Sequence, residues 1–129
     1  MPGELSGKKV LLVDDDRDIL TAMKTILAEQ GPEILTAEDG DEALEAAATQ
    51  SPDAVVLDMM MPKRSGMLVL EKLRRGKARN QPPYVIMITA NRGQRHKAYA
   101  EALGVSAYLY KPFRMEQLVE SVRKVLGAG

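Results

Sequence analysis

The feature that most constrains the fold of this chain is a fivefold alternation of short apolar runs with stretches of helical spacing. Three of the runs are almost continuously apolar, which is typical of strands buried on both faces of a parallel sheet. Between the first two runs, apolar residues repeat with the period of an amphipathic helix. The alternation therefore predicts an α/β sandwich with right-handed crossovers. The predicted strands are Lys9–Val13, Glu33–Ala37, Ala54–Leu57, Tyr84–Ile88 and Ala107–Tyr110.

Glycine, proline and aspartate mark the ends of the predicted helices. Gly31-Pro32 and Ser51-Pro52 should end the first two, because proline cannot continue a helix. Asp16 is placed to cap the first helix, and Gly76–Pro83 forms a long basic connection that we expect to be mobile. The next three helices are predicted at Asp41–Gln50, Met67–Arg75 and Gln94–Leu103, and the last carries Leu118, Val122 and Val125 on one face.

Length and composition exclude several classes of protein. The 129 residues fit one domain, with its core over about residues 8–126. The chain has no cysteine and one histidine, which excludes a disulfide scaffold, a thiolate zinc site and a cysteine nucleophile. No apolar run approaches the ~20 residues of a membrane span, and the N-terminal residues lack the apolar stretch of a signal peptide. We therefore expect a cytoplasmic protein with no membrane contact.

The charges are balanced overall but unevenly distributed along the chain. There are 18 basic and 18 acidic residues, yet residues 1–62 carry 14 acidic and 4 basic side chains, and residues 63–129 carry the reverse. A net charge of zero argues against a general nucleic-acid binder. If the fold interleaves the two halves, the asymmetry has no consequence.

Charged and hydroxyl side chains follow four of the predicted strands. Asp14 and Asp15 come after the first strand, Asp58 after the third, Thr89 after the fourth and Lys111 after the fifth. Because the carboxyl ends of parallel strands share one edge of the sheet, these side chains should converge where such folds bind ligands. Each residue alone has an ordinary interpretation: the aspartates as a polar loop or a turn residue, the threonine as the end of a strand and the lysine as a surface residue. Their combination at four strand ends is what indicates a binding site.

Clustered carboxylates are unfavourable unless something offsets their charge. Two of them ~5 Å apart at an effective dielectric constant near 20 repel by roughly 3 kcal/mol. Oxygen ligands without cysteine or histidine favour Mg²⁺, Mn²⁺ or Ca²⁺ over zinc, and Mg²⁺ commonly leaves positions for phosphate oxygens. With a lysine and a hydroxyl opposite, the set predicts a phosphoryl-binding site, in which a carboxylate can act as nucleophile and form an aspartyl-phosphate.

Four segments resemble the receiver domain of two-component response regulators, in the same order and over essentially the whole chain. They are VLLVDDD (10–16), VVLDMMMPKRSG (55–66), VIMITA (85–90) and YLYKPF (108–113). The resemblance implies a doubly wound, flavodoxin-like (βα)5 three-layer sandwich with strand order 2-1-3-4-5. It also implies a phosphorelay signalling module rather than an enzyme, limited to self-phosphorylation from a phosphodonor and slow autodephosphorylation.

The resemblance assigns roles to the residues at the strand ends. Asp58 would be the phospho-acceptor, taking its phosphoryl group from a phosphohistidine on a sensor histidine kinase or a histidine phosphotransfer protein. Asp14 and Asp15 would hold Mg²⁺ (or Mn²⁺), together with Asp58 and the backbone carbonyl of Met60. Lys111 would pair with the phosphoryl oxygens.

The resemblance also implies a conformational switch. Thr89 would turn toward the phosphoryl group, Tyr108 would swing inward into the vacated space, and Lys111-Pro112 would be a cis peptide. These movements would remodel the surface formed by the fourth helix, the fifth strand and the last helix, over residues 94–126. That surface would bind a downstream protein target or a second copy, and no direct nucleic-acid contact is expected.

Three groups of residues depart from the family pattern or lie outside it. Lys63-Arg64 stand where many receivers carry an acidic residue or a second glycine. Because they are close to Asp58 in the sequence, we expect them either to lengthen or to shorten the lifetime of the phosphoryl group. Met59–Met61 are interpreted as loop and core filling, with partner contact as the alternative. A further basic group consists of the segment Gly76–Pro83 together with Arg92, Arg95, His96 and Lys97. It forms either a solvated surface or a docking face for an acidic partner.

Two rival functions fit parts of the sequence. Asp14-Asp15-Asp16 contains the D-x-D of aspartate-nucleophile phosphatases, with Asp14 as nucleophile. However, Asp18 stands where that motif needs Thr or Val, and 129 residues leave no cap domain. The other rival is a phosphorylation-independent interaction module, which the intact set of carboxylates, hydroxyl and lysine disfavours. A phosphatase would turn over, whereas a receiver would be labelled stoichiometrically at Asp58.

Overall fold

The computed structural model describes residues 3–61 and 64–127, which form five strands and five helices in strict alternation. Every element predicted from the sequence is present within these residues. In chain order they are β1 (Lys9–Val13), α1 (Arg17–Ala28), β2 (Glu33–Ala37), α2 (Gly40–Gln50), β3 (Ala54–Asp58), α3 (Gly66–Arg74), β4 (Tyr84–Thr89), α4 (Gln94–Ala102), β5 (Ala107–Tyr110) and α5 (Met115–Val125).

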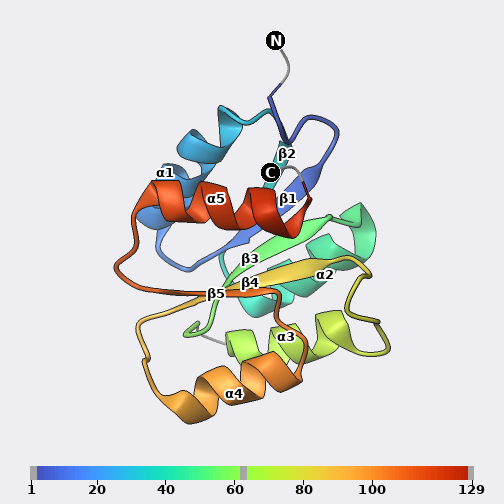
Figure 1. Cartoon of the computed structure of the whole chain (residues 1–129), viewed down its shortest axis with the longest axis vertical. Helices are drawn as coiled ribbons and strands as arrows, with labels where there is room; N and C mark the ends of the chain where they lie inside the picture. The colour runs from blue at the N-terminus through green and yellow to red at the C-terminus, as the bar shows by residue number, and fades with distance from the viewer. Residues whose placement is uncertain (1–2, 62–63, 128–129) are drawn as a thin grey trace.

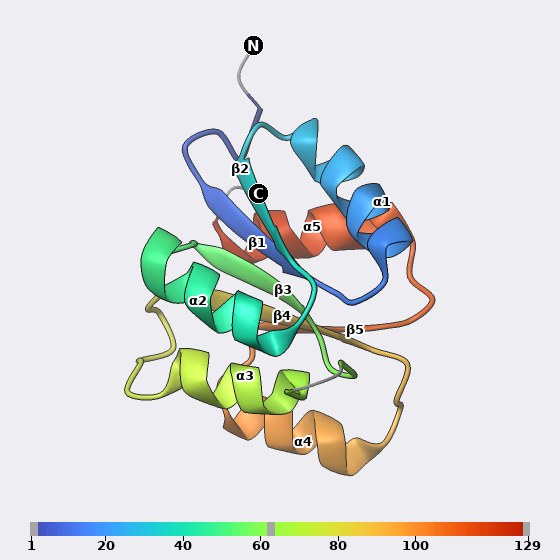
Figure 2. The ribbon, with the colours of Figure 1, turned by 180° about the vertical axis from the view of Figure 1, so that it is seen from behind.

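The strands form one parallel sheet in the order β2-β1-β3-β4-β5, which confirms the predicted topology. Helices α1 and α5 cover one face of the sheet, and α2, α3 and α4 cover the other (Figures 1 and 2). Successive side chains of a strand point to opposite faces, so β1 sends Val10 and Leu12 toward α1 and α5, and Leu11 and Val13 toward the other helices. We call the two apolar layers the α1–α5 core and the α2–α4 core.

The helix ends follow the local chemistry of the sequence. The side chain of Asp16 accepts hydrogen bonds from the backbone N–H groups of Asp18 (2.9 Å) and Ile19 (3.3 Å), which confirms it as the cap of α1. Gly31 adopts φ +89° just beyond α1, a conformation that glycine reaches without a Cβ clash. Ser51 ends α2 in the left-handed region with φ 48°.

Two strands extend one residue further than predicted. Asp58 pairs with Ile88, and Thr89 pairs with Tyr110, so both residues close their strands rather than follow them. Aspartate is uncommon in strands, whereas the β-branched threonine is common there. The backbone pairing of neighbouring strands continues regardless of the side chains, and it fixes both residues at the sheet edge.

The connection over residues 76–83 is tied to the body of the protein by a buried arginine. Arg74, 6% exposed, donates through Nη1 to the carbonyls of Gln81 (2.5 Å) and Pro83 (3.1 Å), and through Nη2 to that of Ala78 (2.6 Å). Tyr84 adds a hydrogen bond from its hydroxyl to the carbonyl of Asn80 at 2.8 Å. The composition of this segment favours a mobile loop, but these contacts give it a defined path.

Candidate functional site

The predicted side chains meet at the carboxyl edge of the sheet. Asp14 follows β1, Asp58 ends β3 and Lys111 follows β5. Carboxylate oxygens of Asp14, Asp15 and Asp58 lie within 4.8 Å of one another. The Nζ atom of Lys111 is 3.2 Å from Oδ2 of Asp14 and 3.6 Å from Oδ1 of Asp58. The convergence predicted from the strand ends is therefore present.

Backbone hydrogen bonds orient the two buried carboxylates. Asp14 and Asp58 are 1% and 4% exposed, whereas Asp15 is open to solvent. Oδ1 of Asp14 accepts from the backbone N–H of Asp16 at 2.9 Å, and Oδ1 of Asp58 accepts from that of Met60 at 3.2 Å. These bonds hold each carboxylate while leaving other oxygen lone pairs available for a ligand.

Burial and the neighbouring charges shift the pKa values of both Asp58 and Lys111. Burial, with the negative charges of Asp14 and Asp15, raises the pKa of Asp58 to about 6, against the opposing effects of Lys111 and the Met60 N–H. Burial alone would lower the pKa of Lys111, but the adjacent Asp58 and Asp14 carboxylates raise it above its ordinary value. Lys111 is therefore charged at neutral pH, and the pKa of Asp58 lies only slightly below neutral pH.

The chemistry of the donor set fits a hard divalent cation. Three carboxylates with oxygens close enough to share one ion, two of them buried and only partly balanced by one lysine, form the arrangement that Mg²⁺ or a similar ion stabilises. The acidic triad is therefore able to hold a metal ion. The Met60 side chain is 65% exposed, and the role expected for its backbone carbonyl stays a prediction.

The loop after β3 passes close beneath the site and requires a glycine. The N–H of Met59 donates to the carbonyl of Ile88, and its carbonyl accepts from the N–H of Gly66, both at 2.8 Å. A Cβ atom on Gly66 would lie 2.2 Å from the carbonyl oxygen of Asp58. The start of α3 is therefore packed directly against the backbone of Asp58.

Thr89 lies at the same edge, but its hydroxyl is engaged elsewhere. Oγ1 donates to the sulfur of Met59 at 3.6 Å and accepts from the N–H of Asn91 at 2.9 Å. Within the part of the chain that the structure describes, it makes no hydrogen bond with Asp58. The interpretation of Met59 as core filling is confirmed by its 3% exposure. Its contact with Thr89 has no sequence signal, because it depends on the rotamers of two side chains 30 positions apart.

Tyr108 is half-buried against the α2–α4 core, beside the site. Its ring stands edge-on to that of Tyr110 with centroids 5.4 Å apart, and Arg92 covers the Tyr110 ring at 4.5 Å. Burial raises the pKa of the Tyr108 hydroxyl, which has no hydrogen-bond partner among the described residues. The Lys111-Pro112 peptide is cis, as the resemblance implied.

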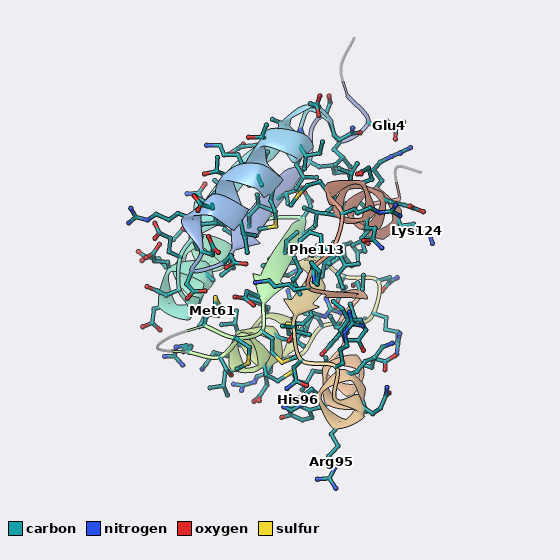
Figure 3. The ribbon with its side chains drawn as sticks, turned by 90° about the vertical axis from the view of Figure 1, so that its left-hand side faces the viewer. Glu4, Met61, Arg95, His96, Phe113 and Lys124 are labelled. Atoms are coloured by element: carbon teal, nitrogen blue, oxygen red, sulfur yellow. The ribbon has the colours of Figure 1, made fainter. Side chains whose placement is uncertain are left out.

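Among the residues that the structure describes, the basic side chains noted in the sequence are exposed or partly exposed. Arg64 pairs with Asp41 of α2 at 2.6 Å, so this guanidinium is held by another carboxylate than Asp58, and Lys63 lies outside the described residues. Arg95 and His96 extend from α4 into solvent (Figure 3). The side chain of Asp16 caps α1, so the D-x-D pair Asp14 and Asp16 is not gathered in one site as a phosphatase would need.

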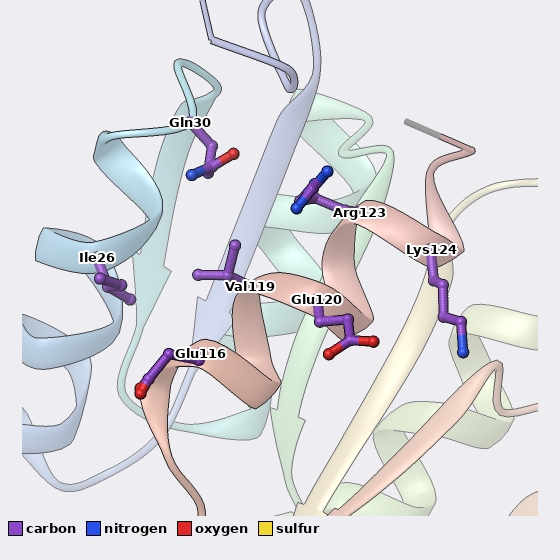
Figure 4. A pocket seen from close by; sticks show the side chains of 7 residues that line it. All are labelled: Ile26, Gln30, Glu116, Val119, Glu120, Arg123 and Lys124. Carbon is purple, nitrogen blue, oxygen red and sulfur yellow. The ribbon is translucent and has the colours of Figure 1, made fainter. Parts of the chain in front are cut away.

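A second concave surface lies between α1 and α5 (Figure 4), and its lining does not include Asp14, Asp15 or Asp58. Ile26 and Val119 give it an apolar floor, and Glu116, Glu120 and Arg123 line its rim with mixed charge. None of the helices that the structure describes has the length and apolar character needed to cross a bilayer.

Doubly wound α/β proteins bind their ligands at the carboxyl edge of the sheet, and the carboxylates and lysine gathered there suit a cation and an anionic group. The chain matches the response regulator receiver domain over residues 10–123. It therefore belongs to the response regulator receiver family, whose domains are typically non-enzymatic signalling modules that partner with histidine kinases.

Sequence similarity to two bacterial regulatory proteins agrees with membership in this family. The chain is 37% identical over 120 residues to the alkaline phosphatase synthesis transcriptional regulatory protein PhoP of Bacillus subtilis, covering 93% of this chain and 49% of that protein. It is 39% identical over 118 residues to the transcriptional regulatory protein CpxR of Escherichia coli, covering 92% and 49%. The chain thus spans about half the length of these curated relatives.

Solved receiver structures match over nearly their full length. The receiver domain of the Francisella response regulator 1452 superposes with a TM-score of 0.84 at 34% identity, covering 94% of this chain and 98% of that one. The chemotaxis response regulator CheY4 of Vibrio cholerae superposes with a TM-score of 0.82 at 31% identity, covering 92% and 98%.

Proposed function

We propose that the chain is a phosphorylation-dependent signalling switch whose phospho-acceptor is Asp58, in a receiver domain over about residues 8–126. The observation that carries the proposal is the position of this carboxylate. It is buried at the sheet edge, 3.6 Å from the amine of Lys111 and beside two further carboxylates. The donor is a phosphohistidine on a sensor histidine kinase or a histidine phosphotransfer protein.

The transfer requires an ionised Asp58. A carboxylate oxygen forms a bond to phosphorus while the P–N bond of the phosphohistidine breaks and its electron pair stays on the imidazole. Lys111 pairs with the phosphoryl oxygens, and Asp14, Asp15, Asp58 and the Met60 carbonyl hold Mg²⁺ (or Mn²⁺). When bound, the ion supplies charge neutralisation for the phosphoryl oxygens.

The output is a change of surface. Thr89 gains a stronger acceptor in a phosphoryl oxygen than in a thioether, so its hydroxyl turns toward Asp58, and Tyr108 moves into the space behind it. The surface of α4, β5 and α5 over residues 94–126 then binds a downstream protein or a second copy. Neither nucleic acid nor membrane is expected to contact the domain directly, whatever the longer relatives do.

Intact mass after incubation with acetyl phosphate and Mg²⁺ tests the proposal. We expect one added phosphoryl group in the parent protein and none in Asp58→Asn. An adduct that persists in Asp58→Asn places the nucleophile elsewhere, and continuous release of phosphate with Asp14 as the labelled residue indicates the phosphatase instead. A phosphohistidine donor replaces acetyl phosphate where the small donor gives no adduct. Absence of label from both donors overturns the proposal.

A further inference from the structure

The hydroxyl of Thr89 is held in place by a sulfur atom. It donates to Sδ of Met59 at 3.6 Å and accepts from the N–H of Asn91 at 2.9 Å. Thr89 is fully buried, so a donor without an acceptor here would carry the full cost of desolvation. Met59 supplies the acceptor that this buried proton needs.

Met59 is itself fixed in position. Its backbone is bound on one side to Ile88 of β4 and on the other to Gly66 of α3. A Cβ on Gly66 would lie 2.7 Å from the Cα of Met59, so the segment has no room to shift toward that helix. The side chain is 3% exposed and packs in the α2–α4 core. The thioether is therefore presented to Thr89 at a defined place, directly after the acceptor aspartate.

We propose that Met59 is a positioning residue that holds Thr89 in its resting orientation and so sets the threshold of the switch. The inference rests on the proposed function, because it gives Thr89 the role described above. A thioether is a weak acceptor, whereas a hydrogen bond to a charged phosphoryl oxygen is roughly twice as strong as a neutral one. Met59 satisfies the hydroxyl at rest and yields it when a phosphoryl group is present.

The first test measures the Met59–Thr89 contact in the unphosphorylated protein, where the proposed function plays no part. A double-mutant cycle combines Met59→Leu, which keeps volume and removes the acceptor, with Thr89→Val, which removes the hydroxyl. We expect the two changes to be coupled by about two- to ten-fold in the unfolding equilibrium constant, as for a typical buried hydrogen bond. Additive effects of the two substitutions overturn the proposal.

The second test asks whether the contact opposes activation. Beryllofluoride with Mg²⁺ serves as the phosphoryl analogue. We expect Met59→Leu to bind it about two- to ten-fold more tightly, because destabilising the resting state favours the switched one. The matched control is Met87→Leu, since Met87 is equally buried in the α2–α4 core but makes no hydrogen bond with Thr89 among the described residues.

The outcomes separate this inference from the proposed function. Tighter binding in Met59→Leu, unchanged binding in Met87→Leu and loss of the Met59→Leu effect in the Thr89→Val background support the positioning role. Equal affinities of the parent and Met59→Leu overturn it and leave phosphorylation at Asp58 untouched. Failure of the parent protein to take a phosphoryl group, with a coupled pair in the first test, overturns the proposed function and confines Met59 to a packing role.

Discussion

At the scale of single residues, the proposed function of Asp58 requires a charge that the fold disfavours at this position. Its pKa is raised from 3.8 to about 6, mainly by burial and then by the charge of Asp14. Between these two pH values the folded protein binds more protons than the unfolded chain. The contribution of Asp58 to stability is therefore complete below about pH 4, falls as the pH rises to about 6, and stays low above that.

Replacing this carboxylate should stabilise the metal-free protein at neutral pH. We expect Asp58→Asn to raise the free energy of unfolding at pH 8 by up to about 3 kcal/mol, since one pKa unit corresponds to about 1.4 kcal/mol, and to have little effect near pH 4. Urea unfolding in the presence of a chelator measures both values. The control is Asp15→Asn, which removes an exposed carboxylate and should change stability much less. Equal effects of Asp58→Asn at the two pH values would contradict the assignment.

Lys111 balances the two buried carboxylates, and its loss should have the opposite consequence. In Lys111→Met we expect the pKa of Asp58 to rise above about 6, because the nearest cation is gone. The metal-free protein should lose about 1–3 kcal/mol at pH 8, the cost of leaving a buried polar group without its partner, and less at pH 5, where protonation removes one of the uncompensated charges. NMR titration of the Asp58 carboxyl together with unfolding at both pH values checks this. Lys124→Met, on the outer face of α5, serves as the control.

Most of the site can be predicted from the residues at the strand ends. Asp14, Asp58, Thr89 and Lys111 each stand at the end of an apolar run, and a parallel sheet brings such ends to one edge. The orientation of Thr89 could not be predicted, since it depends on where the Met59 sulfur packs. The role of Tyr108 comes from the family resemblance alone, because nothing in its spacing distinguishes it from an ordinary strand residue.

At the scale of elements, the sequence predicts strands and helices to within a residue or so, but it does not reveal what holds the connections. Arg74 lies in a run of basic residues and looks like any solvated cation there. In the fold it is buried, because the end of α3 turns it under the connection, where three carbonyls accept its protons. The side chain thereby acts as the internal support of residues 76–83.

Removing this support should loosen the connection without opening the site. We expect Arg74→Met to lose about 1–3 kcal/mol of stability, as for hydrogen bonds to a charged group, and to lose hydrogen-exchange protection in residues 76–83. Arg75→Met is the matched control, since that exposed arginine just after α3 pairs with Glu71 of the helix and its loss should cost less than about 0.5 kcal/mol. If the two variants show the same hydrogen-exchange protection in residues 76–83, Arg74 does not order the connection.

At the scale of the whole molecule, the topology separates the two halves of the charge pattern instead of interleaving them. Strands β2, β1 and β3 from the acidic half are contiguous in the sheet, and β4 and β5 from the basic half form its other side. The strands of the two halves are therefore not interleaved in the sheet, although the Arg64–Asp41 and Lys111–Asp14 ion pairs join the halves. Helix α5 lies beside α1 on the same face of the sheet (Figure 1), and its own charges are balanced, with two acidic and two basic residues. The strand order therefore predicts an electrostatic dipole in a molecule of zero net charge.

A dipolar molecule of zero net charge should bind surfaces of either sign, because each surface interacts mainly with the nearer end. Between about 0.01 and 0.1 M salt the Debye length falls from about 30 to about 10 Å, so the far end is progressively screened. We expect retention on both cation and anion exchangers at pH 7 within this range.

Replacing exposed Lys77 and Arg79 by Gln should lower the salt needed for elution from the cation exchanger. Replacing exposed Glu29 and Glu45 by Gln should lower the salt needed for elution from the anion exchanger. Passage of the parent protein through both columns at low salt would mean that the charges are mixed at its surface after all, and steering of a partner by this dipole would then lose its physical basis.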